Sequence, residues 1–231
     1  MSLLTIVQDG VREIGGFAVP STVVGGDDPL AVQSLAIING IGRELAVLHD
    51  WQSLITGATI TTVNGQANYA IPADLRKFAN VTFWDRTEEE RIIGPVSPEE
   101  WQTFQSGLIE STTQRYFRVG AGLISFFPTP DANGDTFAYE YFSRNWVLSA
   151  ASVAKAAFDA DDDTSRIDEE LIRRAFVYRL REAKGLDAEA ARAHYLTHLA
   201  GVVAIDKPRP IISTLPGRRF YPDVGQVIPL P

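Results

Sequence analysis

Residues 115–146 of the chain read RYFRVGAGLISFFPTPDANGDTFAYEYFSRNW. Three runs rich in β-branched and aromatic residues are separated here by Gly-Ala-Gly and by a longer segment of Pro, Asp, Asn and Gly. Short β-prone runs bounded by such residues predict antiparallel strands joined by turns. In the third run Phe137, Tyr139 and Tyr141 alternate with other residues, so one face of the predicted sheet is aromatic. Because no residue in the stretch resembles a catalyst, we expect a sheet that packs and presents a surface.

Further strands are predicted on the N-terminal side of this stretch, where the hydrophobic pattern has a period of two. Residues 58–63 and 66–71 flank Asn64-Gly65, a strong signal for a hairpin with a type I′ turn. Additional strands are expected over residues 75–84 and 91–96. Together with the three runs of the opening stretch, these segments predict an antiparallel β region.

Two helices are predicted before the β region. Apolar residues at helical spacing, followed by Gly15-Gly16, indicate a short helix at the N-terminus. Asp28-Pro29 combines an N-cap with Pro at the first helical position, and predicts a second helix that runs to about residue 49. Gly40 and Gly42 lie inside this helix, where each costs about 1 kcal/mol against Ala. Close approach of a neighbouring element would explain them.

Three more helices follow from local start and stop signals. Residues 97–100 form a capping box, which predicts a short helix within the β region. Asp168 precedes an amphipathic pattern that ends at Gly185, and Asp187 precedes a second helical pattern. Because so short a turn joins them, these last two helices are expected to form an antiparallel pair.

The order of these elements predicts an α+β fold, a helical bundle with an inserted antiparallel β domain. The bundle comprises residues 1–56 and 149–204, and the β domain comprises residues 57–148. Residues 205–231 hold six of the thirteen prolines and few apolar side chains, so we expect an extended C-terminal arm rather than a packed layer.

Composition limits the possible functions of this chain of 231 residues. It contains no cysteine, which excludes disulfides and thiolate chemistry, and its net charge of −8 argues against general affinity for DNA or acidic membranes. The start of the chain lacks the features of a signal peptide, so we expect synthesis in the cytoplasm. The arm carries a net charge of +2 and the rest of the chain −10, which suits docking of the arm onto another copy.

One acidic segment has part of the spacing of a calcium-binding loop. Asp159, Asp161, Asp163 and Glu170 match the first, third, fifth and twelfth positions of such a loop. Thr164 stands where the loop requires Gly. We therefore favour a solvated acidic turn that caps the following helix.

Two other groups of residues receive structural rather than chemical interpretations. His194 and His198 lie one helical turn apart, but Tyr195 stands where the HExxH zinc motif needs Glu, so surface or interface histidines are expected. Five basic residues of one predicted helix could contact nucleic acid, although ion pairs with nearby glutamates are favoured. These basic residues are Arg173, Arg174, Arg179, Arg181 and Lys184.

Motifs for catalysis are missing from the sequence. No GxSxG nucleophile elbow and no GxxxxGK[ST] phosphate loop occurs, and the paired glycines lack a strand–turn–helix setting. Acidic residues are plentiful, but the sequence assigns none of them a pocket or a partner. We therefore expect a protein that is not an enzyme and that uses no cofactor or metal.

Three stretches together resemble the head-to-tail adaptor proteins of tailed phages. The first is a helix pair that ends in a Trp and leads to NYAIPADLRKFANVTF at residues 68–83. The second is ISFFPTP followed by FAYEYFSRNW, within residues 124–146. The third is DDDTSRIDEELIRRAFVYRLREAKGLDAEAARAHY at residues 161–195. The resemblance covers most of residues 30–200.

This resemblance implies a structural protein of the virion neck, made in the host cytoplasm. Copies would form a dodecameric ring around a channel through which DNA passes as non-specific cargo, bound to the portal on one side and to a tail or nozzle protein on the other. The resemblance carries over no catalytic residues. The arm would reach onto the portal or a neighbouring subunit, with interface-prone side chains as its anchors. These are Arg218, Arg219, Phe220 and Tyr221.

Two alternative functions remain open from the sequence. One is a β-sheet module of a phage tail that binds carbohydrate or a cell surface, with Trp84, Trp101 and Tyr139 as stacking platforms. The other is a metal-dependent hydrolase that uses the acidic segment around Asp161.

Overall fold

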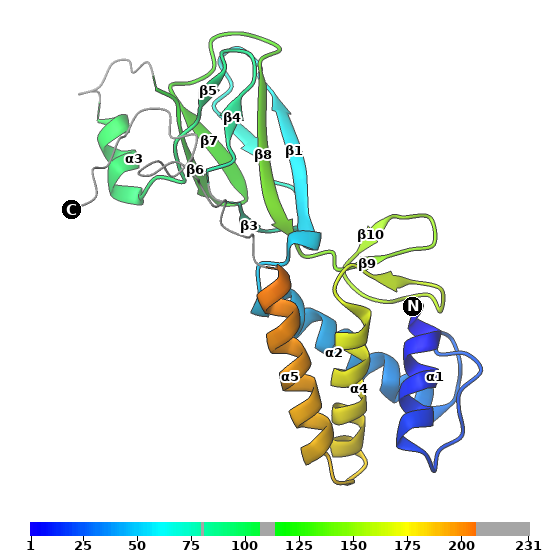
Figure 1. Ribbon diagram of the computed structural model, residues 1–231. Helices are drawn as coiled ribbons and strands as arrows, with labels where there is room; N and C mark the ends of the chain where they lie inside the picture. The colour runs from blue at the N-terminus through cyan, green and yellow to red at the C-terminus, as the bar shows by residue number, and fades with distance from the viewer. Residues whose placement is uncertain (80, 107–113, 207–231) are drawn as a thin grey trace, which may run out of the picture.

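The computed structural model describes residues 1–79, 81–106 and 114–206. It is elongated, with a helical body at one end and a β domain at the other (Figure 1). The helices are α1 (Leu3–Ile14), α2 (Pro29–Leu48), the short 3₁₀ helix η1 (Gln52–Leu54), α3 (Pro98–Gln105), α4 (Glu169–Ala183) and α5 (Glu189–Asp206). The strands are β1 (Ile55–Thr61), β2 (Asn68–Ala70), β3 (Leu75–Phe78), β4 (Trp84–Asp85), β5 (Glu90–Arg91), β6 (Tyr116–Gly120), β7 (Leu123–Phe127), β8 (Thr136–Ser143), β9 (Val147–Leu148), β10 (Ala154–Lys155) and β11 (Thr164–Ser165).

The helical body is formed by α1, α2, α4 and α5, as expected from the two ends of the sequence. α4 lies at its centre and packs on the other three helices. The predicted caps are present: Asp28 accepts a hydrogen bond from the backbone N–H of Leu30, and Asp168 accepts one from that of Leu171. A three-stranded sheet of β9, β10 and β11 completes this body and was not predicted, because each of its strands has only two residues.

Close packing explains one of the two glycines inside α2. A Cβ atom added at Gly42 would lie 2.0 Å from Cζ2 of Trp146, whose side chain is fully buried. A Cβ atom at Gly40 would meet nothing within 4 Å, so the expectation of close approach is wrong at that position. At the end of the helix, the Trp51 indole N–H donates to the carbonyl of Leu45 at 2.6 Å.

The β domain consists of two antiparallel sheets that share one core. The larger has the order β1-β8-β4-β5, with β3 also paired to β8, and the smaller has the order β2-β7-β6. The predicted aromatic face of β8 is confirmed, since Phe137, Tyr139 and Tyr141 are all buried in this core. Rings from the two sheets meet directly, as Phe126 contacts Phe137 at 4.9 Å between centroids.

The predicted hairpin around Asn64-Gly65 is wrong, although a turn is present there. The N–H of Gln66 donates to the carbonyl of Val63, but only Gly65 has a positive φ (80°), so the turn is not type I′. β1 pairs with β8, and β2 pairs with β7 in the other sheet. The strands separate because Ile60 and Tyr69 reach the shared core from opposite sheets.

Two other predicted strands are broken. The expected strand over residues 75–84 is divided into β3 and β4, with a bend at Val81, where φ is 66°. The expected strand over residues 91–96 is reduced to β5 and a single bridge between Ile93 and Tyr116. The capping box is confirmed at the start of α3.

The fold class is therefore α+β, with a bundle of helices and antiparallel sheets inserted between α2 and α4. The predicted arm was expected to begin at residue 205, but residues 205 and 206 are the last two of α5, and residues 207–231 lie outside the described residues.

Candidate assembly surfaces and the interdomain joint

One arginine joins both chain segments that connect the helical body to the β domain. The Arg166 guanidinium donates to the carbonyl of Asn145 at 3.1 Å and to that of Ser53 at 2.5 Å. Ser53 lies on the segment that enters the β domain, and Asn145 lies on the segment that leaves it. Burial lowers the pKa of Arg166, and the carboxylate of Asp74 opposes that shift. The guanidinium therefore links the two connecting segments, and the region where they meet is called the joint below.

Asp74 organises the β-domain side of the joint. Its carboxylate accepts hydrogen bonds from the hydroxyls of Tyr141 at 2.9 Å and Ser143 at 2.6 Å. Its carbonyl accepts from the N–H of Arg144 at 2.7 Å. Burial and the bond to Asp74 raise the pKa of Tyr141 to about 12, so this phenol stays protonated and remains a donor. The end of β8 is thereby fixed at the joint.

Carboxylates from the helical body bind the other segments of the joint. Asp50 forms ion pairs with Arg76 and Lys77 of β3, each at 2.7 Å. Asp206, the last residue of α5, bonds to Nε2 of His49 at 3.0 Å and accepts from the N–H of Gln52 at 3.1 Å. The end of α5 is thus held three residues before β1 begins.

The acidic segment is not the solvated turn that we expected. Asp163 is buried, and its carboxylate accepts from the ammonium of Lys155 and from the N–H groups of Asp159 and Ala160. Burial raises the pKa of this carboxyl, but those bonds outweigh burial and leave the pKa lowered. This carboxylate can be buried because Lys155 of β10 neutralises its charge.

Asp161, in the same acidic segment, binds the loop between α1 and α2. Its carboxylate accepts from the hydroxyl of Thr22 at 2.7 Å and from the N–H groups of Val23 and Val24 at 3.0 and 2.8 Å. Despite burial, these bonds lower the pKa of Asp161. The carboxylates of Asp161 and Asp163 therefore bind donors of the protein itself, and no cluster of three metal-ligating side chains is found in the parts of the chain described.

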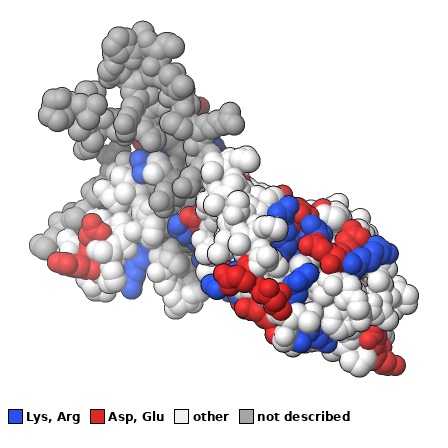
Figure 2. Space-filling model, turned by 60° about the horizontal axis from the view of Figure 1, so that its bottom comes forward, with Lys and Arg blue, Asp and Glu red and all other residues white. Residues whose placement is uncertain are grey.

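Three of the five basic residues pair with glutamates, as favoured from the sequence, whereas Arg181 donates to the carbonyl of Asp187 and Lys184 lies over the ring of Phe17. Arg173 bonds to Glu170 and also to Glu13 of α1, and Arg174 bonds to Glu170. The hydrogen bond from Arg173 is the main cause that lowers the pKa of Glu170 to about 2. Figure 2 shows positive and negative side chains interspersed over the visible face of the helical body. This arrangement differs from the continuous basic surface that nucleic acid requires.

The histidines of α5 have different surroundings. His198 lies 3.1 Å from the carboxylate of Asp168, which also caps α4, and His194 is exposed. The pair therefore does not converge on a common site.

Apolar side chains remain exposed on two helices of the body. α5 has no buried residue, and between positions 190 and 205 its only charged residue is Arg192. α2 would be long and apolar enough to cross a membrane, but 44% of that stretch is buried inside the body. The exposed apolar residues of the two helices are Val32, Val47, Leu48, Leu196 and Ile205. Contacts between subunits are one way in which such side chains are removed from water.

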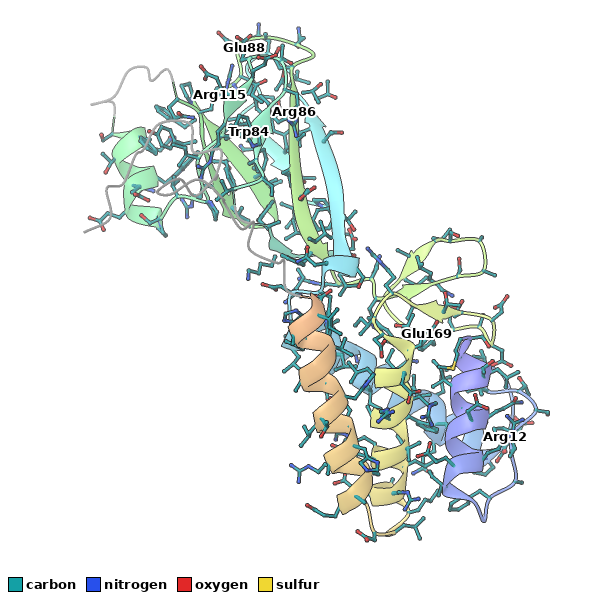
Figure 3. All side chains as sticks on the ribbon, viewed as in Figure 1. Arg12, Trp84, Arg86, Glu88, Arg115 and Glu169 are labelled. Carbon is teal, nitrogen blue, oxygen red and sulfur yellow. The ribbon has the colours of Figure 1, made fainter. Side chains whose placement is uncertain are left out.

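An open groove of about 500 Å³ crosses the outer face of the larger sheet. Trp84 and Arg86 line it and lie beside β8 in Figure 3. The sequence proposed Trp84, Trp101 and Tyr139 as stacking platforms for carbohydrate, but Tyr139 is only 3% exposed and packs against Phe83 inside the core. Tyr139 therefore cannot present a ring face to a sugar.

The residues predicted to anchor the arm are Arg218, Arg219, Phe220 and Tyr221, and they lie outside the described residues. Conversely, the joint was missed from the sequence, which gave Arg166 no role. Its bonds go to backbone carbonyls, which carry no sequence signal. A lone arginine between an acidic turn and a helix start was the only available sign.

Comparison with known families gives one match. Residues 1–208 match the family described as SU10 adaptor protein, so the match spans the helical body and the β domain together. No curated protein matches the chain.

Proposed function

This chain belongs to the SU10 adaptor protein family, a family of structural phage head–tail adaptors, and we propose from this that its copies form a ring docked on the portal. The ring, a dodecamer in this proposal, connects the capsid to a tail or nozzle protein and leaves a central channel for DNA. The family match over residues 1–208 is the observation that carries the proposal.

Surface properties support an assembly role. The apolar residues left exposed on α2 and α5 belong to a body whose interior is otherwise well packed. Lateral contacts between neighbouring copies would remove these side chains from water, at about 25 cal/mol per Å² of apolar surface. The net charge of −10 outside the arm suits a conduit for DNA, because a basic lining would retain the phosphate backbone.

The distribution of molecular mass tests the ring. We would measure it by mass photometry for the purified protein, alone and mixed with the portal protein encoded by the same genome. The proposal expects a large ring in one of the two samples, and the sample in which it appears shows whether docking drives assembly. A monomer that persists in both samples would overturn the proposal.

Substitutions in the arm test its anchoring role. Replacement of Arg218, Arg219, Phe220 and Tyr221 by Ala should weaken portal binding at least tenfold, because Arg and aromatic side chains contribute most to interface energy. Arg86→Ala provides a matched control, since this arginine is exposed on the β domain and lies outside the arm. Equal portal binding by the arm variant and the control would refute the anchoring role.

A further inference from the structure

Strand β1 leaves one long side of the larger sheet open. Among the described residues it pairs only with β8. The N–H of Thr62 donates to the carbonyl of Asp135 at 2.9 Å, which continues the same register by one residue pair. Hydrogen-bonded and non-bonded pairs alternate in antiparallel ladders. The backbone groups of Gly57, Thr59 and Thr61 therefore point away from β8, toward the open side.

The other side of β8 agrees with this assignment. The N–H of Arg86 donates to the carbonyl of Thr136, and the N–H of Ala79 donates to that of Glu140. Thr136 and Glu140 of β8 thus bond to residues that follow β4 and β3. The backbone groups of the odd-numbered residues of β8 are therefore the ones that face β1. The alternation is consistent along the strand.

This edge lacks the usual protection against pairing. Its sequence, ITGATIT, contains no charged residue and no proline, and its register with β8 is regular over all seven pairs. By contrast, the outer edge of β6 is covered, because the N–H of Phe117 donates to Ile93 and its carbonyl accepts from Val96. A long, uncharged and regular edge is a template for another strand.

The chain beyond the described residues begins close to this edge. Asp206 bonds to the N–H of Gln52, three residues before the first residue of β1. Residues 207–210 can span about 13 Å at full extension. The following segment can therefore reach the beginning of the open edge without any rearrangement of the helical body.

The sequence of that segment suits a short strand. Residues 211–215 read IISTL, which is free of charge and glycine, and Pro210 and Pro216 flank it. A proline at each end would limit the strand to five residues, fewer than the seven residues over which β1 pairs with β8. The groove over the outer face of the sheet also reaches this edge at Gly57 and Thr59, which leaves room for side chains of an added strand.

We propose that residues 211–215 add to β1 of the same chain as an additional parallel strand. The direction is parallel because both segments start at the joint and lead away from the helical body. The inference rests on the open edge of β1 and on the length of chain between Asp206 and residue 211. It does not depend on the proposed ring.

Amide hydrogen exchange of the full chain, followed by NMR, tests the pairing. The amides of Gly57, Thr59 and Thr61 should be as protected as those of Ala58 and Ile60, which face β8. Comparable exchange by both sets supports the proposal. Exchange of the first set at the rate of an unpaired strand would overturn it.

Proline variants identify the segment responsible. Ile212→Pro and Ser213→Pro each remove one backbone donor, and together they cover both alternations of the added strand. At least one of them should accelerate exchange at Thr59 at least tenfold, while Ile228→Pro, elsewhere in the arm, should leave it unchanged. Failure of both substitutions to accelerate exchange would overturn the assignment of this segment.

Disulfide trapping distinguishes the same chain from a neighbour, since the protein has no cysteine of its own. Thr59→Cys is combined in turn with Ile212→Cys, Ser213→Cys or Thr214→Cys to cover the possible registers. A disulfide formed within single chains supports the proposal. Covalent dimers and larger ladders on a non-reducing gel would show instead that a neighbour's segment occupies the edge.

Discussion

Among the described residues, the core of the helical body contains twenty buried residues, four of them aromatic, whereas seven of the eleven buried residues in the core of the β domain are aromatic. The two cores have no residue in common. The helices close around many aliphatic side chains, while the two small sheets fill the space between them with a few large rings. Phe83 and Tyr139, for example, stack with 4.6 Å between centroids. A small β domain with few core positions thus depends more strongly on each of them.

The largest effect is expected from loss of one ring in the β domain. Phe126→Ala should cost about 3–5 kcal/mol, because the residue is 1% exposed and contacts rings of both sheets. Amide exchange should accelerate throughout β7 and β8 and much less in α4. Phe126→Leu serves as the control that retains most of the volume. Equal acceleration in α4 would show that the two cores unfold as one unit.

The next effect concerns a glycine in the core of the helical body. Gly42→Ala should destabilise the protein by about 3 kcal/mol, since its new methyl group would overlap the buried Trp146 indole. Gly40→Ala, two residues away, should instead stabilise by up to about 1 kcal/mol, because it gains helix propensity in open space. Urea unfolding of both variants provides the measurement. Equal effects of the two substitutions would contradict the packing of Trp146 against α2.

The joint between the two regions should have an intermediate effect. Arg166→Met should cost about 2 kcal/mol, because it leaves the carbonyls of Ser53 and Asn145 without their charged donor. Arg174→Met, at a more exposed ion pair of α4, should cost less than about 1 kcal/mol. Thermal unfolding measures both. A cost for Arg166→Met no larger than that of the control would show that the joint depends on other contacts.

The smallest effect is the pH dependence of the ion pairs that Glu170 forms with Arg173 and Arg174 within α4. The pKa of Glu170 is lowered to about 2 in the folded protein, from 4.5 when unperturbed. Its stabilising contribution is therefore complete above pH about 4.5 and is lost as the pH falls toward 2. Glu170→Gln should remove about 1 kcal/mol at pH 7 and less at pH 2.5. A stability difference from the parent chain that is constant between these pH values would contradict this assignment.

Local signals predicted the helices well. The caps at Asp28, Ser97 and Asp168 were recognised because a cap and the helix that it starts are adjacent in sequence. The aromatic face of β8 was recognised for a similar reason, since alternation lies within one strand. The hairpin at Asn64-Gly65 failed because β1 pairs with residues about 80 positions away in the sequence.

The candidate site was predicted less completely than the fold. The burial of Asp163 could not be foreseen, because it depends on an ammonium group brought over by the small sheet of β9, β10 and β11. Arg166 was missed because its partners are backbone carbonyls of distant segments. The arm residues 218–221 were nominated from composition and charge, and their role stays a prediction.

The pairing of Ile55 with Phe142 has an evolutionary consequence. These residues face each other across the first rung of the β1–β8 ladder, so the chain enters and leaves the β domain about 5 Å apart. A domain whose two ends are adjacent can be lengthened, shortened or replaced as a cassette without any change in the path of the helices. Recombination between phages could therefore exchange this domain while the helical scaffold is inherited intact.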